Sequence, residues 1–510
     1  MLRGLLSVGG FTLLSRLTGF ARDLVLASVL GAGVVNDAFV VAFRLPNQFR
    51  AIFGEGAFNT AYVPSYSRVL TTEGPGEAKH FSSQIFTVLL ASQLVLLALA
   101  LVFTPEFVKL VAPGFEADPE KFRLAVRMTR ICFPYLLFIT LVTLHSGTLN
   151  AHKRFVIAAF APVLLNLAII AFLAVAFLFP NAGEAASWGV VISGVLQLAL
   201  VAAAARREGL LETLAWPNLS PDVRQFFAAL VPAIIGSAGV QIAILADTII
   251  ASLLPTGMVS SIYYAERLYQ LPIGVIGVAA GTVLLPEMSR RLAGGDVDGA
   301  SHAQNRTMAI TVALSAPFCV AFLLIPELVT RAAFLRGAFS AEAAANSAAV
   351  LAAYGLGLMP IVLIRSGVAS FQARGDTTAP MLISLGAIAV NVGLKIALYQ
   401  PLGAVGLALA TAVGAWVNLG GLVLLARRRE WIAFDATLTE TAAATLCASG
   451  LLALSVALAA APTLAYAQSL PRFQNEARLA ILALIGAVVY AVILAASLKL
   501  LGVRFRRRKA

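Results

Sequence analysis

Charged side chains interrupt an apolar segment near the start of the chain, between Leu5 and Val69. These charges include Arg16, Arg22, Asp23, Asp37, Arg44, Arg50 and Glu55. A charge at a bilayer centre costs roughly 2.5–3.5 kcal/mol on insertion scales, so four arginines facing lipid would cost on the order of 10 kcal/mol. We therefore expect the arginines to line a water-filled cavity between helices, where they bind an anion. Arginine suits phosphate, because its planar guanidinium donates two parallel hydrogen bonds and stays charged at cellular pH.

The elements that hold these arginines must be transmembrane helices. The chain has 510 residues, of which 60% are hydrophobic and 12% charged, and its mean hydropathy is +0.89. This composition excludes a soluble globular protein. Apolar runs of about 20 residues, the length that crosses a bilayer, predict an all-α polytopic membrane protein with about fourteen transmembrane helices. The second run, Asp37–Val69, is too long for one straight helix and contains Pro46 and Pro64, so we expect it to be broken or bent.

Lysine and arginine outside the spans gather in alternate connections. These residues are Arg68, Lys79, Lys153, Arg154, Arg206, Arg207, Arg290, Arg291, Arg374 and Arg427 to Arg429, with a basic tail from Arg504 to Lys509. The positive-inside rule then places both termini in the cytoplasm. The net charge of +12 is mostly a consequence of this topology. We expect the tail to lie against anionic lipid headgroups and to bind no nucleic acid.

An internal repeat divides the predicted helices into two sets. Thr60–Arg68 and Thr282–Arg290 share the pattern T-x3-P-x2-S-R at a displacement of 222 residues, and Asn150-Ala151 matches Gln372-Ala373 at the same displacement. Arg44 likewise matches Arg267 within the pattern A-x-R-L, displaced by 223 residues. Parallel repeats in transporters are related by a pseudo-twofold axis along the membrane normal, with the substrate site between them.

The repeat predicts three parts of the chain. Residues 1–220 form a first lobe of six transmembrane helices, and residues 221–430 form a second lobe of six. Residues 431–510 add two more helices and the basic cytoplasmic tail. If the two lobes rock against each other, a site between them is open to one membrane face at a time.

The motifs in the first two spans resemble a known family. They read Ser15-Arg16-Leu-Thr-Gly19-Phe-Ala-Arg22-Asp23, Gly31-Ala-Gly33, Asn36-Asp37-Ala-Phe39, Arg44-Leu-Pro46-Asn47-Gln-Phe-Arg50 and Phe53-Gly-Glu55-Gly-Ala-Phe58. This series is similar to the MurJ (MviN) lipid II flippases of the multidrug/oligosaccharidyl-lipid/polysaccharide exporter superfamily. Tyr263-Tyr-Ala-Glu-Arg267 continues the resemblance into the second lobe. The resemblance implies a multi-pass protein of the bacterial cytoplasmic (inner) membrane that moves lipid II from the inner to the outer leaflet.

The same resemblance assigns roles to residues of this chain. Arg16, Arg22, Arg50 and Arg267 match the family's cavity arginines and are the candidate substrate-binding residues, while Gly19, Asp23, Asn47 and Glu55 are candidate gating or supporting residues. A kink at Gly19 would let both arginines of the first helix reach one cavity. The alternative is that each arginine pairs with an acid: Arg22 with Asp23 or Asp37, Arg50 with Glu55, and Arg267 with Glu266.

Asp247 is a further intramembrane charge, in the seventh predicted span. With Asn391, Lys395 and Thr411 it resembles the positions of a sodium site in some family members. Lys395 departs from that pattern, because its ammonium stands where a second acidic ligand is expected. Three interpretations remain open: a structural ion pair between Asp247 and Lys395, a proton-linked pair, and a sodium site.

The expected activity is transport without an enzymatic step. No G-x4-G-K-[ST] loop is present to hold ATP, so we expect membrane potential to drive the lobes, with or without a coupled ion. No cofactor or metal is expected, and the histidines show no metal-ligand spacing. Lipid II and membrane lipids are the expected partners of a monomer, with cell-wall synthesis proteins as further candidates. The alternatives are a polysaccharide-lipid or multidrug exporter of the same superfamily and, less favoured, a membrane glycosyltransferase.

Overall fold

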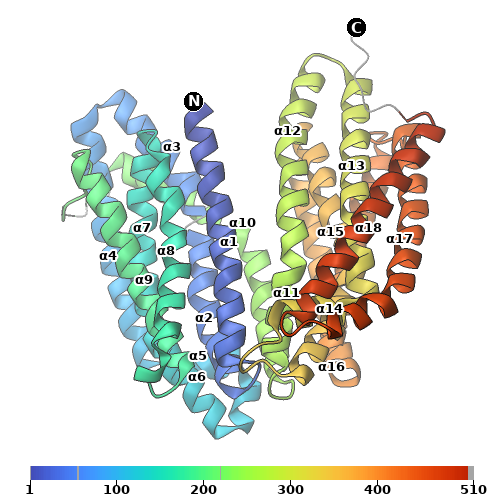
Figure 1. The fold of residues 1–510 in the computed structure, drawn as a ribbon. Helices are drawn as coiled ribbons and strands as arrows, with labels where there is room; N and C mark the ends of the chain where they lie inside the picture. The colour runs from blue at the N-terminus through green and yellow to red at the C-terminus, as the bar shows by residue number, and fades with distance from the viewer. Residues whose placement is uncertain (1, 54–56, 217, 219, 504–510) are drawn as a thin grey trace. The chain divides into compact units, whose positions relative to one another are not determined.

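The computed structural model divides the chain into two compact units (Figure 1). Unit 1 comprises Met1–Ser260 with Arg336–Phe339, and unit 2 comprises Ser261–Leu335 with Ser340–Ala510. The structure describes the backbone of residues 2–53, 57–216, 218 and 220–503, and the side chains of these residues except 2–8, 45–53, 57, 235–240, 242 and 278. All regular secondary structure in the described ranges is helical. The predicted all-α polytopic class is therefore confirmed.

Unit 1 consists of long helices joined by short connections. Its helices are α1 (Leu2–Leu30), α2 (Val34–Phe53), α3 (Ala57–Thr72), α4 (Pro75–Val102), α5 (Thr104–Val111), η1 (Pro113–Ala117), α6 (Pro119–Cys132), α7 (Pro134–Ala151), α8 (Phe155–Ala174), η2 (Ala176–Leu178), α9 (Ala182–Arg207) and α10 (Pro221–Ser252). Helix α8 packs against both α1 and α9. At Gly189 of α9 a Cβ atom would lie 2.9 Å from the Cα of Ile169, so glycine is required for this close approach.

Unit 2 likewise consists of long helices joined by short connections. Its helices are α11 (Met258–Pro272, whose first residues belong to unit 1), the π-turn η3 (Ile273–Gly277), α12 (Val278–Ala293), α13 (Val297–Leu324), α14 (Pro326–Phe334), α15 (Ala341–Ala373), α16 (Thr378–Arg428), α17 (Ala436–Gln468) and α18 (Gln474–Leu500). Gly403 interrupts α16 with φ 55° and ψ −135°, so residues 378–402 and 404–428 are two helices joined at a sharp bend.

Ten helical segments in the described residues are long and apolar enough to cross a membrane. One of them is the bent α16, which supplies two of the predicted spans. The remaining predicted spans correspond to α1, to α2 with α3, and to α10, and each of these contains residues whose side chains lie outside the description. The described parts of the second span are helical up to Phe53 and from Ala57, and residues 54–56 lie outside the description, so the predicted break or bend stays a prediction.

Helix α10 packs into unit 1 rather than unit 2. Its Phe226 ring lies 5.7 Å from Phe58, 6.1 Å from Tyr62 and 6.3 Å from Phe81, centroid to centroid. This aromatic cluster ties α10 to α3 and α4, so the packing boundary lies at Ser260 and not at residue 220. The two predicted lobes, in contrast, are defined by the sequence repeat and not by packing. The division into residues 1–220 and 221–430 stays a prediction.

Two short helices reveal a further part of the repeat that the sequence analysis missed. Helix α5 begins Thr-Pro105-Glu-Phe-Val, and α14 begins with the similar Pro326-Glu-Leu-Val. Each precedes a long helical segment of the same length, residues 119–151 as α6 with α7 and residues 341–373 as α15. Both ends of the long segments are displaced by 222 residues, whereas Pro105 and Pro326 are displaced by 221.

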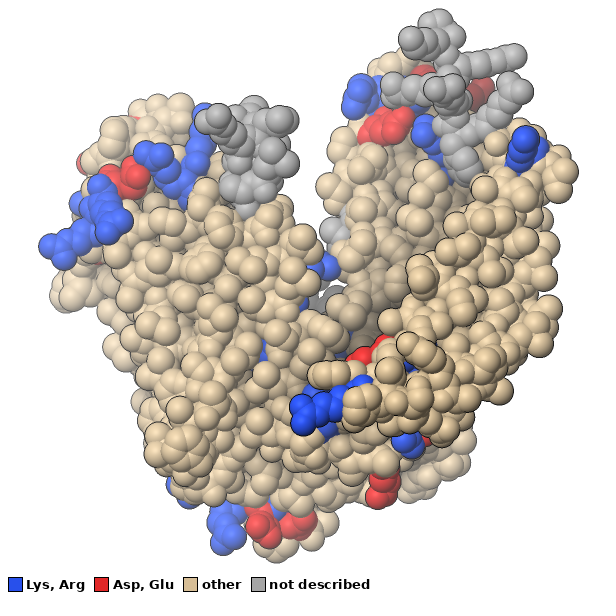
Figure 2. Space-filling view, viewed as in Figure 1, with Lys and Arg blue, Asp and Glu red and all other residues tan. Residues whose placement is uncertain are grey.

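The surface of unit 1 fits a membrane environment. Figure 2 shows its flank at the left as a broad band without Lys, Arg, Asp or Glu, with charged side chains gathered at both ends. Leu94, Val95 and Leu96 of α4 belong to such an apolar surface, since each is at least half exposed. Large aliphatic side chains in this position are expected where lipid, not water, is the solvent.

Candidate functional site

A polar cavity of about 590 Å³ lies within unit 1, between α1, α3, α7, α8 and α9. Its polar lining residues are Thr12, Ser15, Arg16, Asn59, Thr143, Ser146, Asn150 and Gln197. Several of these belong to helices that are otherwise apolar. A cavity with hydroxyl and amide groups can hold water inside a membrane protein, which keeps a charged side chain solvated.

Arg16 is the charged residue of this cavity. Its side chain is exposed, and among the described residues it has no carboxylate, carbonyl or aromatic partner. An unpaired guanidinium beside hydroxyl groups has five donors available for an anion. Phosphate is the anion whose geometry fits best, because two of its oxygens accept the parallel N–H groups.

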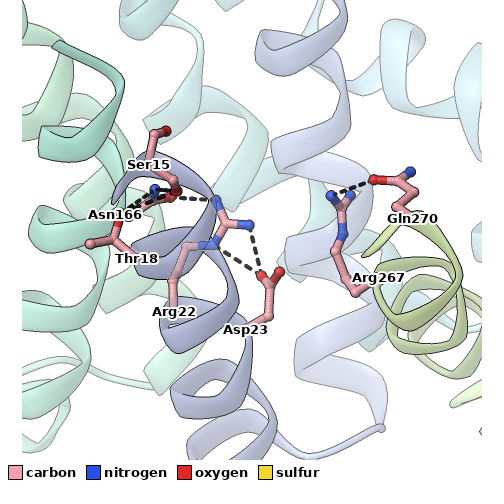
Figure 3. A network of polar contacts seen from close by, with 7 residues as sticks. All are labelled: Ser15, Thr18, Arg22, Asp23, Asn166, Arg267 and Gln270. Carbon is pink, nitrogen blue, oxygen red and sulfur yellow. Dashed lines mark hydrogen bonds and ion pairs between the residues drawn. The ribbon is translucent and has the colours of Figure 1, made fainter. Parts of the chain in front are cut away.

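Arg22 is held differently, although it lies on the same helix. Its Nε and Nη2 donate to Asp23 Oδ1 at 3.0 and 2.7 Å, and its Nη1 donates to Asn166 Oδ1 at 3.1 Å (Figure 3). The guanidinium also lies 5.5 Å from the Phe43 ring. Both Arg22 and Asp23 are buried. Of the two acids expected for Arg22, the structure selects Asp23, and Arg22 does not line the cavity that contains Arg16.

Asn166 is a site residue that the sequence analysis missed. Its Nδ2 donates to the Ser15 carbonyl at 3.0 Å and to Thr18 Oγ1 at 3.1 Å, so one amide joins α8 to α1 and also holds Arg22 (Figure 3). A Cβ at Gly19 would lie 3.5 Å from Asn166 Nδ2, an ordinary van der Waals contact, so this neighbour does not require glycine there. The available signal was that Asn166 is the single polar side chain of α8.

Asp37 forms the most completely bonded carboxylate of unit 1 within the described residues. Its oxygens accept from Lys121 Nζ at 2.7 Å, from the Gly257 amide at 2.8 Å, and from the amide and hydroxyl of Ser260 at 2.9 and 2.6 Å. Asp37 is fully buried and Lys121 is 3% exposed. This cluster joins α2 to α6 and to the start of α11. Asp37 is therefore the partner of Lys121 and not of Arg22.

The second part of the predicted arginine motif is only partly described. Arg44 Nη1 donates to Thr248 Oγ1 of α10 at 3.1 Å. Asn47 and Arg50 lie on α2 with side chains outside the description, and Glu55 lies outside the described residues altogether. The expected pairing of Arg50 with Glu55 stays a prediction.

Arg267 lies on α11 in unit 2. Its guanidinium lies 4.6 Å from the Tyr263 ring, and Nη1 donates to Gln270 Oε1 at 3.4 Å (Figure 3). Gln270 in turn donates to Glu266 Oε1 at 2.8 Å, so one amide side chain contacts both the arginine and the acid expected to pair with it.

The expected coupling residues are divided between the two units. Asp247 is half-buried on α10 in unit 1, whereas Lys395 is buried on α16 in unit 2. One turn before Lys395, Asn391 Oδ1 is buried and has no hydrogen-bond partner among the described residues, and Thr411 donates to the Leu407 carbonyl at 3.0 Å. The pair, proton and sodium interpretations stay predictions. In the described part of the chain, no three His, Cys, Asp or Glu side chains are grouped as metal ligands.

A second buried network, around His145, was missed because the sequence analysis considered the histidines only as metal ligands. His145 Nδ1 contacts Glu212 Oε2, Thr148 donates to Glu212 Oε1 at 2.6 Å, and the hydroxyls of Tyr62 and Thr148 lie 2.8 Å apart. We call these four residues the linker clamp, since Glu212 belongs to the linker between α9 and α10. All four are at most 4% exposed. The clamp fixes that linker to α3 and α7.

Comparison with known proteins identifies the family. The family model "Lipid II flippase MurJ" matches residues 26–473. A probable lipid II flippase MurJ from Rhizobium meliloti (strain 1021) is 43% identical over 418 residues, covering 81% of this chain and 78% of the relative. The solved structure of a lipid II flippase MurJ in an inward closed conformation has the same fold, with a TM-score of 0.81, 22% identity and coverage of 97% of this chain and 99% of the other.

A more distant structure shows how widely the fold is shared. An inward-facing multidrug resistance MATE family transporter of the MOP superfamily has a TM-score of 0.67 at 15% identity, covering 81% of this chain and 94% of the other. Fold similarity at this identity does not separate an exporter of drugs from a flippase. The family match and the relative at 43% identity do. The chain therefore belongs to the MurJ family of lipid II flippases.

Proposed function

We propose that this chain moves lipid II from the inner to the outer leaflet of a bacterial cytoplasmic membrane. The observation that carries the proposal beyond family membership is Arg16, whose guanidinium has no partner among the described residues and lines a polar cavity of about 590 Å³. The headgroup of lipid II is attached through a pyrophosphate. Two adjacent phosphates match the hydrogen-bonding edge of arginine, and a lysine would offer a point charge only.

The proposed roles of the other residues follow their contacts. Arg50 and Arg267 are further candidates for the pyrophosphate. Arg22 is fixed by Asp23 and Asn166, which suits positioning α1 against α8 so that Arg16 keeps its place in the cavity. Asp23, Asn47, Glu55 and Gly19 remain candidate gating or supporting residues. The carboxylates of Asp23 and Glu55 would repel a pyrophosphate, which argues against direct substrate contact by these two.

The proposed transport cycle is alternating access of two six-helix lobes, residues 1–220 and 221–430, with residues 431–510 as an addition. Both termini are cytoplasmic in this proposal, because the connections rich in lysine and arginine then lie inside. With the cell interior negative, outward movement of each negative charge gains about 2.3 kcal/mol per 100 mV. A pyrophosphate is therefore carried outward by the potential, without ATP. Asp247 and Lys395 are the candidate coupling pair.

The test is complementation of a strain depleted of its own lipid II flippase. Wild type should restore growth and Arg16→Ala should fail to do so. Arg16→Lys should restore growth partly, because lysine keeps the positive charge but lacks the paired N–H donors of a guanidinium. Arg207→Ala is the matched control, since Arg207 is exposed at the end of α9 and outside the cavity. Failure of the expressed wild type would contradict the function, whereas full rescue by Arg16→Ala would contradict only the site.

A second experiment tests the driving force. Purified protein in vesicles containing a fluorescent lipid II should move it faster when the potential favours outward transfer of negative charge. Identical rates at zero and at 100 mV of either sign would exclude the electrical mechanism while leaving the transported lipid unchanged.

A further inference from the structure

Helix α6 carries three arginines on one face, away from the site described above. Arg123, Arg127 and Arg130 follow the spacing i, i+4 and i+7, which places them within about 60° around an ideal helix. They line a cavity of about 610 Å³ in unit 1. The lining of this cavity also includes Phe122 of the same helix and Glu184 and Trp188 of α9.

One of the three arginines is neutralised and two are not. Arg127 Nη2 lies 2.9 Å from Glu184 Oε2, and Glu184 is buried and also accepts from Asn181 Nδ2 at 2.9 Å. Arg123 and Arg130 are exposed and have no hydrogen-bond, ion-pair or aromatic partner among the residues that the structure describes. The lining thus contains three positive charges and one negative charge, which leaves two positive charges without a counter-ion.

The internal repeat shows that the fold does not need these arginines. Residues 119–151 and 341–373 have equal length and correspond at a displacement of 222 residues. The positions equivalent to Arg123, Arg127 and Arg130 are Ala345, Ala349 and Ala352. Alanine therefore satisfies the same helical positions in unit 2, so packing alone does not explain three arginines in unit 1.

The position of the cavity in the membrane makes the charges more unusual. Figure 1 shows α5 and α6 at the end of unit 1 opposite to the N-terminus, which is the outer side if the N-terminus is cytoplasmic. Lysine and arginine are depleted on that side of membrane proteins. Trp188, 42% exposed, fits the interface between hydrocarbon and headgroups, where tryptophan is enriched.

We propose that this cavity binds the phosphate of an anionic phospholipid in the outer leaflet, an inference that rests on the orientation in the proposed function. Arg123 and Arg130 bind the phosphate oxygens, as arginine does through paired N–H donors. Phe122 and Trp188 contact the glycerol and the first carbons of the acyl chains. The Arg127–Glu184 pair fixes the distance between α6 and α9 and keeps the cavity open.

The experiment measures lipid binding by the full chain in neutral detergent through the fluorescence of Trp188, after replacement of the other tryptophans by phenylalanine. Dioctanoyl phosphatidylglycerol should give a saturable change. Arg123→Ala/Arg130→Ala should weaken its binding about 30-fold, since each arginine contributes about 1 kcal/mol toward an anionic lipid and 1.4 kcal/mol is tenfold. Arg123→Lys/Arg130→Lys should keep most of the affinity, which shows that the fold is intact.

The controls distinguish lipid binding at this cavity from a general effect of charge and from binding of free phosphate. Lys109→Ala/Arg472→Ala removes the same charge from exposed positions outside the cavity and should leave the affinity unchanged. An equal loss in this control, an unchanged affinity in the double alanine variant, or equally tight binding of inorganic phosphate would each overturn the proposal. The titration involves no transport, so its result is independent of lipid II flipping. Labelling of Arg123→Cys in intact cells with an impermeant maleimide tests the orientation separately, and protection from the reagent would overturn the outer-leaflet assignment.

Discussion

Replacing Asp37 by asparagine should destabilise unit 1 more than any change to its partner Lys121. Asp37→Asn removes the counter-charge of an ammonium that is 3% exposed, 2.7 Å from the carboxylate. Removing one member of a buried ion pair typically costs about 3–5 kcal/mol, because the other charge is left unpaired. The Phe115 ring, 4.3 Å from Lys121 Nζ, compensates only a part of this loss.

Lys121→Met should cost less, since Asp37 would still accept from the Gly257 amide and from the amide and hydroxyl of Ser260. The double variant Asp37→Asn/Lys121→Met should be more stable than Asp37→Asn alone, because no buried charge is left. The free energy of unfolding can be measured by SDS titration in mixed micelles, followed by tryptophan fluorescence. The three variants and wild type form a double-mutant cycle, and coupled neighbours typically show interaction energies of about 0.5–3 kcal/mol.

Two results would refute this reasoning. An effect of Asp37→Asn below about 0.5 kcal/mol, the range typical of surface substitutions, would mean that the ammonium finds water or another acceptor. Strictly additive losses in the double variant would mean that the two residues act independently, despite the contact between them.

Three further predictions concern other buried or strained positions. Glu212→Gln should lower the unfolding midpoint in detergent by an amount equivalent to about 1–3 kcal/mol, because it leaves the other members of the linker clamp with unsatisfied polar atoms. Gly337→Ala should cost about 1–3 kcal/mol in the same assay, since φ is +59° there and a Cβ would overlap a carbonyl oxygen of α1, and an unchanged midpoint would contradict that geometry. The Ala379 amide, together with Arg429, lowers the pKa of the Asp376 carboxyl below its usual value. This contribution to stability is present above the ordinary Asp pKa and is lost as the pH falls through the lower native pKa, so Asp376→Asn should remove that acid-sensitive part from a pH series of unfolding midpoints, whereas an identical series would refute it.

Sequence reasoning reached the class, the spans and the family because these depend on local composition. Apolar runs of membrane length are visible in any window of about 20 residues, and the motif around Arg16 and Arg22 is continuous in the chain. It could not choose between Asp23 and Asp37 as the partner of Arg22, because the choice depends on Lys121 and Ser260, which come from other helices. It also missed the division of the chain by packing, since the aromatic contacts of Phe226 link helices far apart in sequence.

The sequence alone is enough to show that charged side chains, most of them arginines, lie within apolar segments long enough to cross a membrane. That conclusion follows from transfer free energies alone. Which of these arginines has a protein partner became clear only from the packing of the helices. Arg22 is held by Asp23 and Asn166, whereas Arg16 lines a polar cavity without a partner in the described residues. The physical reason is that the cost of placing a charge in lipid depends on the type of one residue. Its hydrogen-bond partners, in contrast, depend on which helices pack together.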